Sequence, residues 1–139
     1  MPPDQPFVKV GVAVLIEKAG RLLLIRRSGS HGAGTWATPG GHLDFGEAPE
    51  QCGAREAREE TGLEVADLTF VAITNDLFAA EQKHYITIWM RAGRIVGEPS
   101  IASPREMTEI GWFAWDALPE PLFLPLAQLV AGDAYPRAG

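Results

Sequence analysis

The sequence predicts an α/β fold in which a mixed β-sheet is packed between helices. Several short apolar runs, rich in Val, Ile, Leu and Phe, are separated by polar or glycine-containing breaks, which is typical of strands. Two other stretches, about 49–61 and about 120–131, have helical features. Strands interspersed with two helices in 139 residues favour a single domain over residues 1–139.

The first strands are predicted as a pair joined by a tight turn. Residues 7–16 are mostly apolar, the polar and glycine-containing residues 18–20 interrupt the run, and residues 22–25 resume it. Residues 28–35 are rich in Gly and Ser and predict a loop. The pattern therefore indicates strand, turn, strand and loop in that order.

A short extended segment and a helix follow this loop. Residues 36–38 are extended in pattern and end at Pro39-Gly40-Gly41. Pro49 suits the first turn of a helix and Glu50 favours its positive end. Gly62 is suited to the left-handed cap that ends it, so the helix is expected over about 49–61.

The second half predicts more strands and a final helix. Residues 68–77 and 85–90 read as strands, and the proline-containing segment 97–104 leads into a further strand at 110–113. The helical stretch at about 120–131 completes the mixed α/β pattern. Most of the aromatic residues, such as Trp36, Phe45, Phe78 and Trp89, are expected in the core.

Composition excludes several classes of function. With 12 Lys and Arg against 18 Asp and Glu, the net charge of -6 has the wrong sign for a protein that binds nucleic acid through broad counterion release. Cys52 is the only cysteine, so no internal disulfide or cysteine-rich zinc site is expected. Residues 1–6 lack a basic start and no apolar run reaches the length of a membrane span. We expect a cytoplasmic protein without membrane association.

Three glutamates gather on one face of the first helix. Glu56, Glu59 and Glu60 stand at positions i, i+3 and i+4, within an arc of about 100°. Like charges in such pairs repel by roughly 0.2–0.5 kcal/mol each, and a hard divalent cation with oxygen ligands would offset that repulsion. The alternative interpretation is a solvated helix face on which Arg55 and Arg58 form ordinary ion pairs.

The residues around the helix favour the first interpretation. From Gly41 the chain has five residues, then Glu47, then seven residues before the run 55–63, Arg-Glu-Ala-Arg-Glu-Glu-Thr-Gly-Leu. This pattern over residues 41–63 resembles the Nudix box in full, and seven fixed positions give a chance match of about 10⁻⁸. Ala57 is small where the family usually has a larger aliphatic residue. The resemblance implies the Nudix fold and a metal-dependent pyrophosphohydrolase.

The resemblance also implies a role for each matching residue. The cofactor would be Mg²⁺, with Mn²⁺ able to replace it, and its ligands would be Glu56, Glu59, Glu60 and the carbonyl of Gly40. Arg55, paired with Glu47, would orient the glutamates. The general base would be Glu56 or Glu59. Glu106 resembles a glutamate outside the box that some MutT-type members use, and it is a fifth candidate metal ligand; an exposed loop carboxylate is an alternative of at least equal weight.

Segments outside the box suggest a substrate class. Residues 32–36, 39–47, 84–88 and 115–119 resemble the MutT-related branch that contains the eukaryotic enzyme known for clearing thiopurine nucleoside triphosphates. That resemblance implies hydrolysis of a nucleoside triphosphate to a monophosphate and pyrophosphate, by a homodimer. The protein would then bind a nucleotide as its substrate and would bind no nucleic acid.

Five residues are substrate-binding candidates on the same resemblance. Thr87 and Leu126 would border the base, Arg27 would reach the phosphates, and Gly41 and His42 would lie near them. Four of them have a structural alternative: a strand hydroxyl for Thr87, a core side chain for Leu126, a solvated strand end for Arg27 and a loop position for His42.

Two other functions remain open at this point. A Nudix hydrolase could act on a nucleoside diphosphate linked to another group, such as ADP-ribose or a nucleotide sugar. A Nudix domain could also sense nucleotides or bind proteins without catalysis, but such domains commonly lose box glutamates that this sequence keeps. An mRNA-decapping role is disfavoured because the chain has no basic stripe.

Overall fold

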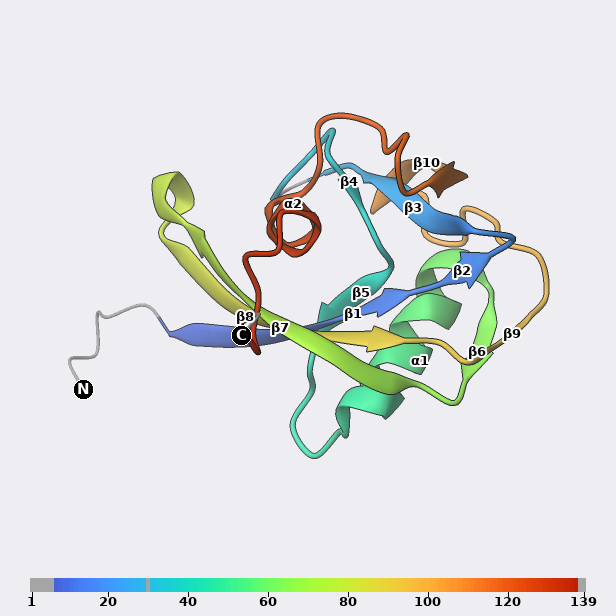
Figure 1. The fold of residues 1–139 in the computed structure, drawn as a ribbon, viewed down its shortest axis with the longest axis horizontal. Coiled ribbons are helices and arrows are strands. Elements are labelled where there is room, and N and C mark those ends of the chain that lie inside the picture. Colours follow the sequence, from blue (N-terminus) through green and yellow to red (C-terminus); the bar gives the residue numbers. More distant parts are fainter. Residues whose placement is uncertain (1–6, 30, 138–139) are drawn as a thin grey trace.

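The computed structural model describes residues 7–29 and 31–137 (Figure 1). Residues 1–6, where a targeting segment was not expected, lie outside the described residues. No helix in the described ranges is long and apolar enough to cross a membrane. In chain order the elements are β1 (Val8–Leu15), β2 (Glu17–Lys18), β3 (Arg21–Arg27), β4 (Trp36–Ala37), β5 (Gly40–His42), α1 (Pro49–Thr61), β6 (Glu64–Ala66), β7 (Thr69–Phe78), the 3₁₀ turn η1 (Ala79–Glu81), β8 (Lys83–Arg91), β9 (Arg94–Val96), β10 (Met107–Ala114) and α2 (Leu124–Val130).

The strands of the described residues form two four-stranded sheets and one two-stranded sheet. The first has the order β5-β1-β8-β7, with β1 parallel to β8 and the other pairs antiparallel. The second has β3 between β10 and β2, with β4 also paired to β3. The small sheet pairs β6 with β9. The predicted α/β fold with a mixed sheet and two helices is confirmed.

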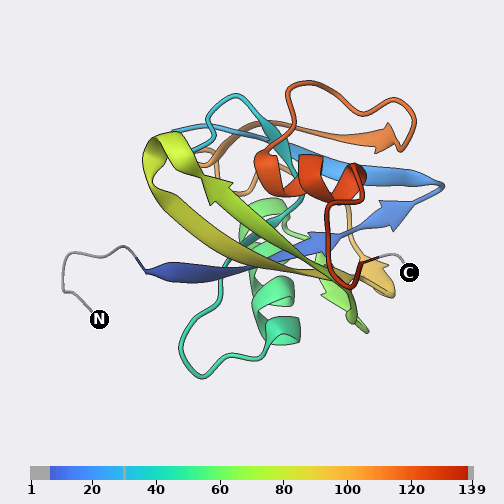
Figure 2. The ribbon, with the colours of Figure 1, turned by 60° about the vertical axis from the view of Figure 1, so that its left-hand side comes forward.

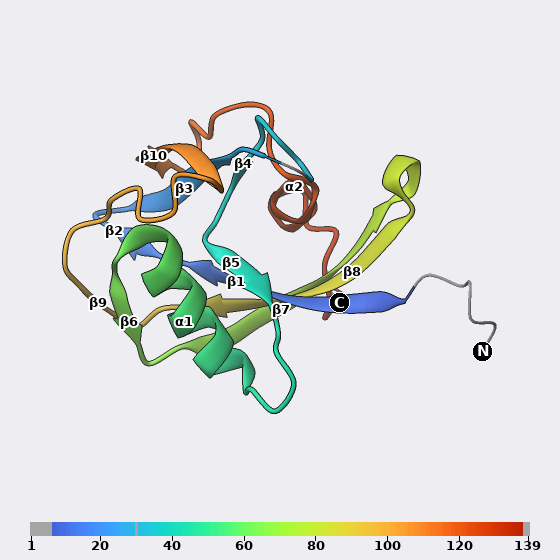
Figure 3. The ribbon, with the colours of Figure 1, turned by 180° about the vertical axis from the view of Figure 1, so that it is seen from behind.

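The second half of strand β1, residues 12–15, is buried on both faces because its apolar side chains point alternately to one face and the other. Ala13 and Leu15 pack in a cluster with Trp89 and with Leu126 of α2. The intervening Val14 packs in a second cluster, which contains Ala57 of α1. The two helices therefore cover opposite faces of this sheet, as Figure 2 shows and as Figure 3 shows from behind.

Helix α1 has the bounds that the sequence predicts. Pro49 occupies its first turn, and the side-chain oxygen of Gln51 accepts the backbone N–H of Ala48 at 2.8 Å. Gly62 ends it with φ of 76°, and its N–H donates to the carbonyl of Arg58 at 2.9 Å. Ala57 is fully buried, so the small residue at this box position sits inside the core.

Other boundaries differ from the prediction. The final helix covers 124–130 rather than about 120–131, because Pro121 disfavours helical geometry in the residue before it, and the extended Phe123 caps a helix whose first turn contains Pro125. Gly40 and Gly41 continue as strand β5 instead of ending the extended segment. The short strands β2, β6 and β9 were not predicted. Among the aromatic residues, Trp36 and Trp89 are buried as expected, but Phe45 is fully exposed.

The left-handed cap at Gly62 gives a testable prediction. Gly62→Ala should lower the free energy of unfolding by about 1 kcal/mol, because a Cβ is disfavoured at positive φ. Gly62→Asn should lose less, since Asn tolerates this conformation. Urea denaturation of the three proteins measures the difference. Equal stability of wild type and Gly62→Ala would contradict it.

Candidate active site

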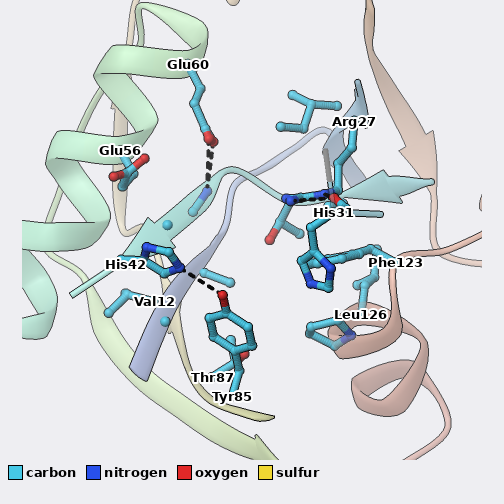
Figure 4. A pocket seen from close by; sticks show the side chains of 18 of the residues that line it. Val12, Arg27, His31, His42, Glu56, Glu60, Tyr85, Thr87, Phe123 and Leu126 are labelled. Carbon is cyan, nitrogen blue, oxygen red and sulfur yellow. Dashed lines mark hydrogen bonds between the residues drawn. The ribbon is translucent and has the colours of Figure 1, made fainter. Parts of the chain in front are cut away.

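A cavity of about 410 Å³ crosses the molecule from α1 to the start of α2. Strands β1, β3, β5 and β8 supply its walls, so residues far apart in the sequence meet there (Figure 4). All five predicted substrate-binding residues line it, together with four of the five candidate metal ligands. These nine are Arg27, Gly41, His42, Thr87, Leu126, Gly40, Glu56, Glu60 and Glu106.

The two ends of the cavity differ in chemistry. One end carries carboxylates, Glu56 and Glu60 from α1 and Glu106 from the segment before β10. The other end is lined by aromatic and apolar side chains, including Phe123 and Leu126 (Figure 4). A ligand with an anionic group at one end and an apolar ring at the other fits this division, provided that a cation accompanies the anionic group.

Arg55 holds the carboxylates of the acidic end in place. Its guanidinium donates to both oxygens of Glu47, at 2.8 and 3.1 Å, and to Glu56 at 2.8 Å. A longer contact of 3.4 Å joins it to Glu59. The hydrogen bonds from Arg55 lower the pKa of Glu47 to about 2. The pairing of Arg55 with Glu47 that the box implied is present.

Glu60 is the most buried carboxylate of the site. Its side chain accepts the backbone N–H of Gly40 at 3.1 Å, and the residue is 5% exposed. Burial raises its pKa to about 8, and the charges of Glu56 and Glu106 add to that rise. Arg27 opposes the rise from across the cavity. A buried carboxylate beside two others is the environment in which a cation would be most stabilising.

Two adjacent glycines allow strand β5 to approach both β1 and α1. A Cβ at Gly40 would lie 2.4 Å from the carbonyl oxygen of Val12, which is backbone. A Cβ at Gly41 would lie 2.4 Å from the carboxyl carbon of Glu56. Gly41 therefore makes room for the carboxylate itself, and this is the physical reason for a glycine at the first position of the box.

The remaining acidic candidates occupy different surroundings. Glu59 has a side chain 54% exposed and lies outside the cavity lining, although the helix carries it beside Glu56. Glu106 lines the cavity and accepts a hydrogen bond from the hydroxyl of Ser103 at 2.8 Å. The structure thus brings Glu106 to the box glutamates and leaves Glu59 at the rim.

The donor set fits a hard divalent cation in chemistry. Carboxylates of Glu56, Glu60 and Glu106 face one cavity, and the backbone of Gly40 adjoins them. Among residues 7–29 and 31–137, no three acidic, His or Cys side chains are yet gathered closely enough to hold one ion. The reason is visible in the contacts, because Arg55 draws Glu56 to one side and Gly40 holds Glu60 on the other.

The wall between the two ends carries Arg27 and His42. Arg27 donates twice to the carbonyl of His31, at 3.1 and 3.0 Å, and its guanidinium lies 4.0 Å from the ring centre of Phe123. His42 contacts the hydroxyl of Tyr85 at 3.1 Å and stacks on that ring. Burial lowers the pKa of His42, which favours a neutral imidazole beside the cavity.

Several site residues were not found from the sequence. Asp44 lies 3.3 Å from Arg55 and lines the cavity. Tyr85 and Phe123 line the apolar end. Asp76 is fully buried below Thr87, whose hydroxyl donates to it. A carboxylate inside a predicted strand was the available signal for Asp76, whereas the others depend on loops and contacts that only the folded chain defines.

Comparison with known proteins identifies the family. The family model described as "NUDIX domain" matches residues 6–133, which is most of the chain. The chain belongs to the Nudix family. The resemblance of residues 41–63 to the Nudix box is thereby confirmed at the level of the family, and Nudix proteins generally use a divalent metal ion.

Individual relatives of this Nudix chain differ in function. The crystal structure of a MutT NUDIX hydrolase from Burkholderia pseudomallei superposes with a TM-score of 0.81 and 35% sequence identity. The matched region covers 85% of this chain and 92% of the Burkholderia chain. The NAD-capped RNA hydrolase NudC of Pseudomonas aeruginosa is 33% identical over 114 residues, 82% of this chain. The Mycobacterium tuberculosis protein named "Putative 8-oxo-dGTP diphosphatase 3" is 33% identical over 117 residues, 76% of this chain.

The curated relatives are longer proteins. The chain spans 39% of the Pseudomonas aeruginosa protein and 52% of the Mycobacterium tuberculosis protein. The shared part is the Nudix domain, and these relatives divide between nucleoside triphosphate and NAD-cap hydrolases by name.

The two glycines of β5 should respond differently to the same substitution. Gly40→Ala places a methyl group against the backbone of β1 and should cost about 1–3 kcal/mol of unfolding free energy. Gly41→Ala meets only the end of a side chain, so it should stay folded while Glu56 is displaced. A misplaced carboxylate should reduce nucleotide hydrolysis about 10²-fold. Denaturation and turnover assays on both variants test this, and the reverse pattern would contradict it.

Stability of the metal-free protein should depend on the ionisation of Glu60. Its pKa of about 8 in the folded protein exceeds the ordinary value of 4.5, so the folded state retains a proton that the unfolded state has lost. The free energy of unfolding should therefore fall as pH rises between those two values.

The measurement is denaturation in the presence of a chelator from pH 5 to pH 8. Glu60→Gln should show a smaller slope against pH, because it has no carboxylate to ionise. Glu50→Gln, at an exposed position on the same helix, should keep the wild-type slope. An unchanged slope in Glu60→Gln would mean that this carboxylate does not govern the pH dependence.

Proposed function

We propose that this Nudix protein hydrolyses a nucleoside triphosphate to a nucleoside monophosphate and pyrophosphate, with Mg²⁺ or Mn²⁺ as cofactor. The observation that supports it is the division of one cavity, with box carboxylates at one end and aromatic side chains at the other. Phosphates belong at the acidic end, accompanied by the cation, and the nucleobase belongs at the apolar end.

The metal ligands in this proposal are Glu56, Glu60 and the carbonyl of Gly40, with Glu59 and Glu106 as further carboxylates. The bound cation would neutralise phosphate oxygens and lower the pKa of a water molecule.

The protein side chains around these ligands position the reacting groups. Arg55 and Glu47 fix the direction of the Glu56 side chain. Arg27 lines the same cavity, and its guanidinium would face the negative charge of bound phosphates. Glu56 is the better candidate for the general base than Glu59, because it lines the cavity and Glu59 lies at the rim. Thr87 and Leu126 would contact the base.

The name of one curated relative favours a second candidate. NudC of Pseudomonas aeruginosa, which hydrolyses NAD-capped RNA according to its name, is as similar as the triphosphate-directed relative. A nucleoside diphosphate linked to another group is therefore the alternative substrate. The finer resemblance to the thiopurine triphosphate branch stays a proposal from the sequence; two residues of its segment 84–88, Tyr85 and Thr87, line the cavity.

A homodimer and a cytoplasmic location stay predictions. The homodimer follows from the resemblance to the branch, and the location follows from the composition. Neither is needed for the chemistry proposed for the cavity.

The deciding experiment is a substrate screen. Nucleoside triphosphates, ADP-ribose, NAD and nucleotide sugars are supplied with Mg²⁺, and products are identified chromatographically. We expect the highest kcat/KM for a triphosphate, with release of monophosphate and pyrophosphate and with no turnover in excess chelator. Release of orthophosphate, or a preference for ADP-ribose or NAD, would replace the proposal with its alternative.

Charge-removing variants test the role of the glutamates. Glu56→Gln and Glu60→Gln should each reduce kcat by roughly 10²–10³, because a contact to charge that develops in the transition state is lost. Glu59→Gln should lose less, since that side chain is half exposed outside the cavity. Glu50→Gln is the matched control on the same helix and should keep wild-type activity. Near-normal turnover by a folded Glu60→Gln protein would show that this carboxylate has no part in metal binding or catalysis.

A further inference from the structure

Beneath the apolar end of the cavity lies a buried polar network centred on Asp76. This residue is on β7 and is 0% exposed. One of its oxygens accepts from the hydroxyls of Thr87, at 2.5 Å, and of Thr74, at 3.2 Å. The other accepts from the side-chain amide of Gln128, on α2, at 2.6 Å. This network links two strands and a helix, and its hydrogen bonds offset the loss of hydration of the buried carboxylate.

The direction of each hydrogen bond can be assigned from the donor types. The indole N–H of Trp89 can only donate, and it donates to the hydroxyl of Thr74 at 3.0 Å. Thr74 must therefore direct its own hydrogen to Asp76. The amide nitrogen of Gln128 also donates to the backbone carbonyl of Asn75 at 2.9 Å, which fixes its orientation. Asp76 accepts at both oxygens, as an ionised carboxylate does.

Thr87 connects this network to the cavity. It lines the cavity and pairs in register with Gly11 of β1. A Cβ at Gly11 would lie 3.9 Å from the Thr87 hydroxyl oxygen, so the glycine leaves that oxygen uncovered by a neighbouring side chain. Because the hydroxyl hydrogen is directed to Asp76, only lone pairs of the oxygen remain for a ligand.

We propose that Asp76 is a specificity-positioning residue, which fixes Thr87 as a hydrogen-bond acceptor toward the bound base and so selects bases that present an N–H group there. This inference rests on the proposed function, in which the apolar end holds the nucleobase. Asp76 acts through Thr87 and does not touch the substrate itself.

The chemical class of the favoured ligand follows from this polarity. An exocyclic amine or a ring N–H can donate to Thr87, whereas a carbonyl oxygen or an unprotonated ring nitrogen would meet its lone pairs. A base that lacks the donor leaves the site without its hydrogen bond and brings two acceptors together. Amino-substituted bases should therefore bind better than otherwise identical bases that lack the amine.

The experiment compares pairs of nucleotides that differ by one amine. dGTP is paired with dITP, which lacks the 2-amine, and dATP is paired with the 5′-triphosphate of purine 2′-deoxyriboside, which lacks the 6-amine. Dissociation constants are measured by calorimetry with Ca²⁺ replacing Mg²⁺, and kcat/KM is measured with Mg²⁺. We expect wild type to prefer the amine in at least one pair by roughly tenfold. Failure to hydrolyse any triphosphate would refute the proposed function, while the ratio of dissociation constants would still test this inference.

Three variants separate polarity from packing. Thr87→Val removes the hydroxyl at nearly the same size and should abolish the preference, whereas Thr87→Ser should keep it. In Asp76→Asn the amide of Gln128 holds the new carbonyl, so the new NH₂ group faces Thr87 and turns the hydroxyl hydrogen toward the cavity. That variant should lose or invert the preference. Thr69→Val, at an exposed position of β7, is the control.

The outcomes are decisive even if one variant is unstable. If Asp76→Asn does not fold, the comparison of Thr87→Val with Thr87→Ser still tests whether the hydroxyl reads the base. A folded Asp76→Asn protein with the wild-type preference would overturn the proposal. So would equal dissociation constants within both nucleotide pairs for wild type, or a preference that persists in Thr87→Val.

Discussion

The close approach of strand β5 to helix α1 is the constraint on which the acidic end of the cavity depends. Gly40 donates its backbone N–H to Glu60, and Gly41 leaves space for the carboxylate of Glu56. The same strand pairs with β1, whose backbone at Val12 leaves no space for a side chain at position 40. A larger residue at position 40 would push the strand away from β1, and one at position 41 would displace the carboxylate of Glu56, so backbone geometry and site chemistry are fixed by the same two glycines.

Electrostatic repulsion is the cost of this arrangement, and Arg55 offsets part of it. The guanidinium contacts Glu47, Glu56 and Glu59, which keeps these charges paired without a bound ion. Glu60 lies beyond these contacts and is buried, so its carboxylate is the one with a strongly raised pKa. Arg55 thus offsets the charge of the other box glutamates but not that of Glu60, where a bound cation would stabilise the folded protein most.

Sequence patterns predicted the parts of the molecule that depend on local structure. Helix α1 was predicted with its bounds because Pro49 and Gly62 mark its ends. The strands with long apolar runs were found, whereas β5 was missed because Gly-Gly usually signals a break and here meets the need for close packing. Asp76 and Tyr85 were missed as site residues because their roles arise from pairing between β7 and β8, a contact that residue spacing does not specify.

The two ends of the cavity rely on opposite uses of buried charge. At the acidic end, Glu60 is buried with one backbone donor and neighbouring negative charges, which leaves a demand for an external cation. At the apolar end, Asp76 receives three side-chain donors from the protein, which offset much of its desolvation. Glu60 is therefore placed to bind a cation, whereas the hydrogen bonds of Asp76 are all made within the protein. Because Asp76 is fully buried and its oxygens are already paired, it can orient the Thr87 hydroxyl without competing for the ligand's donors.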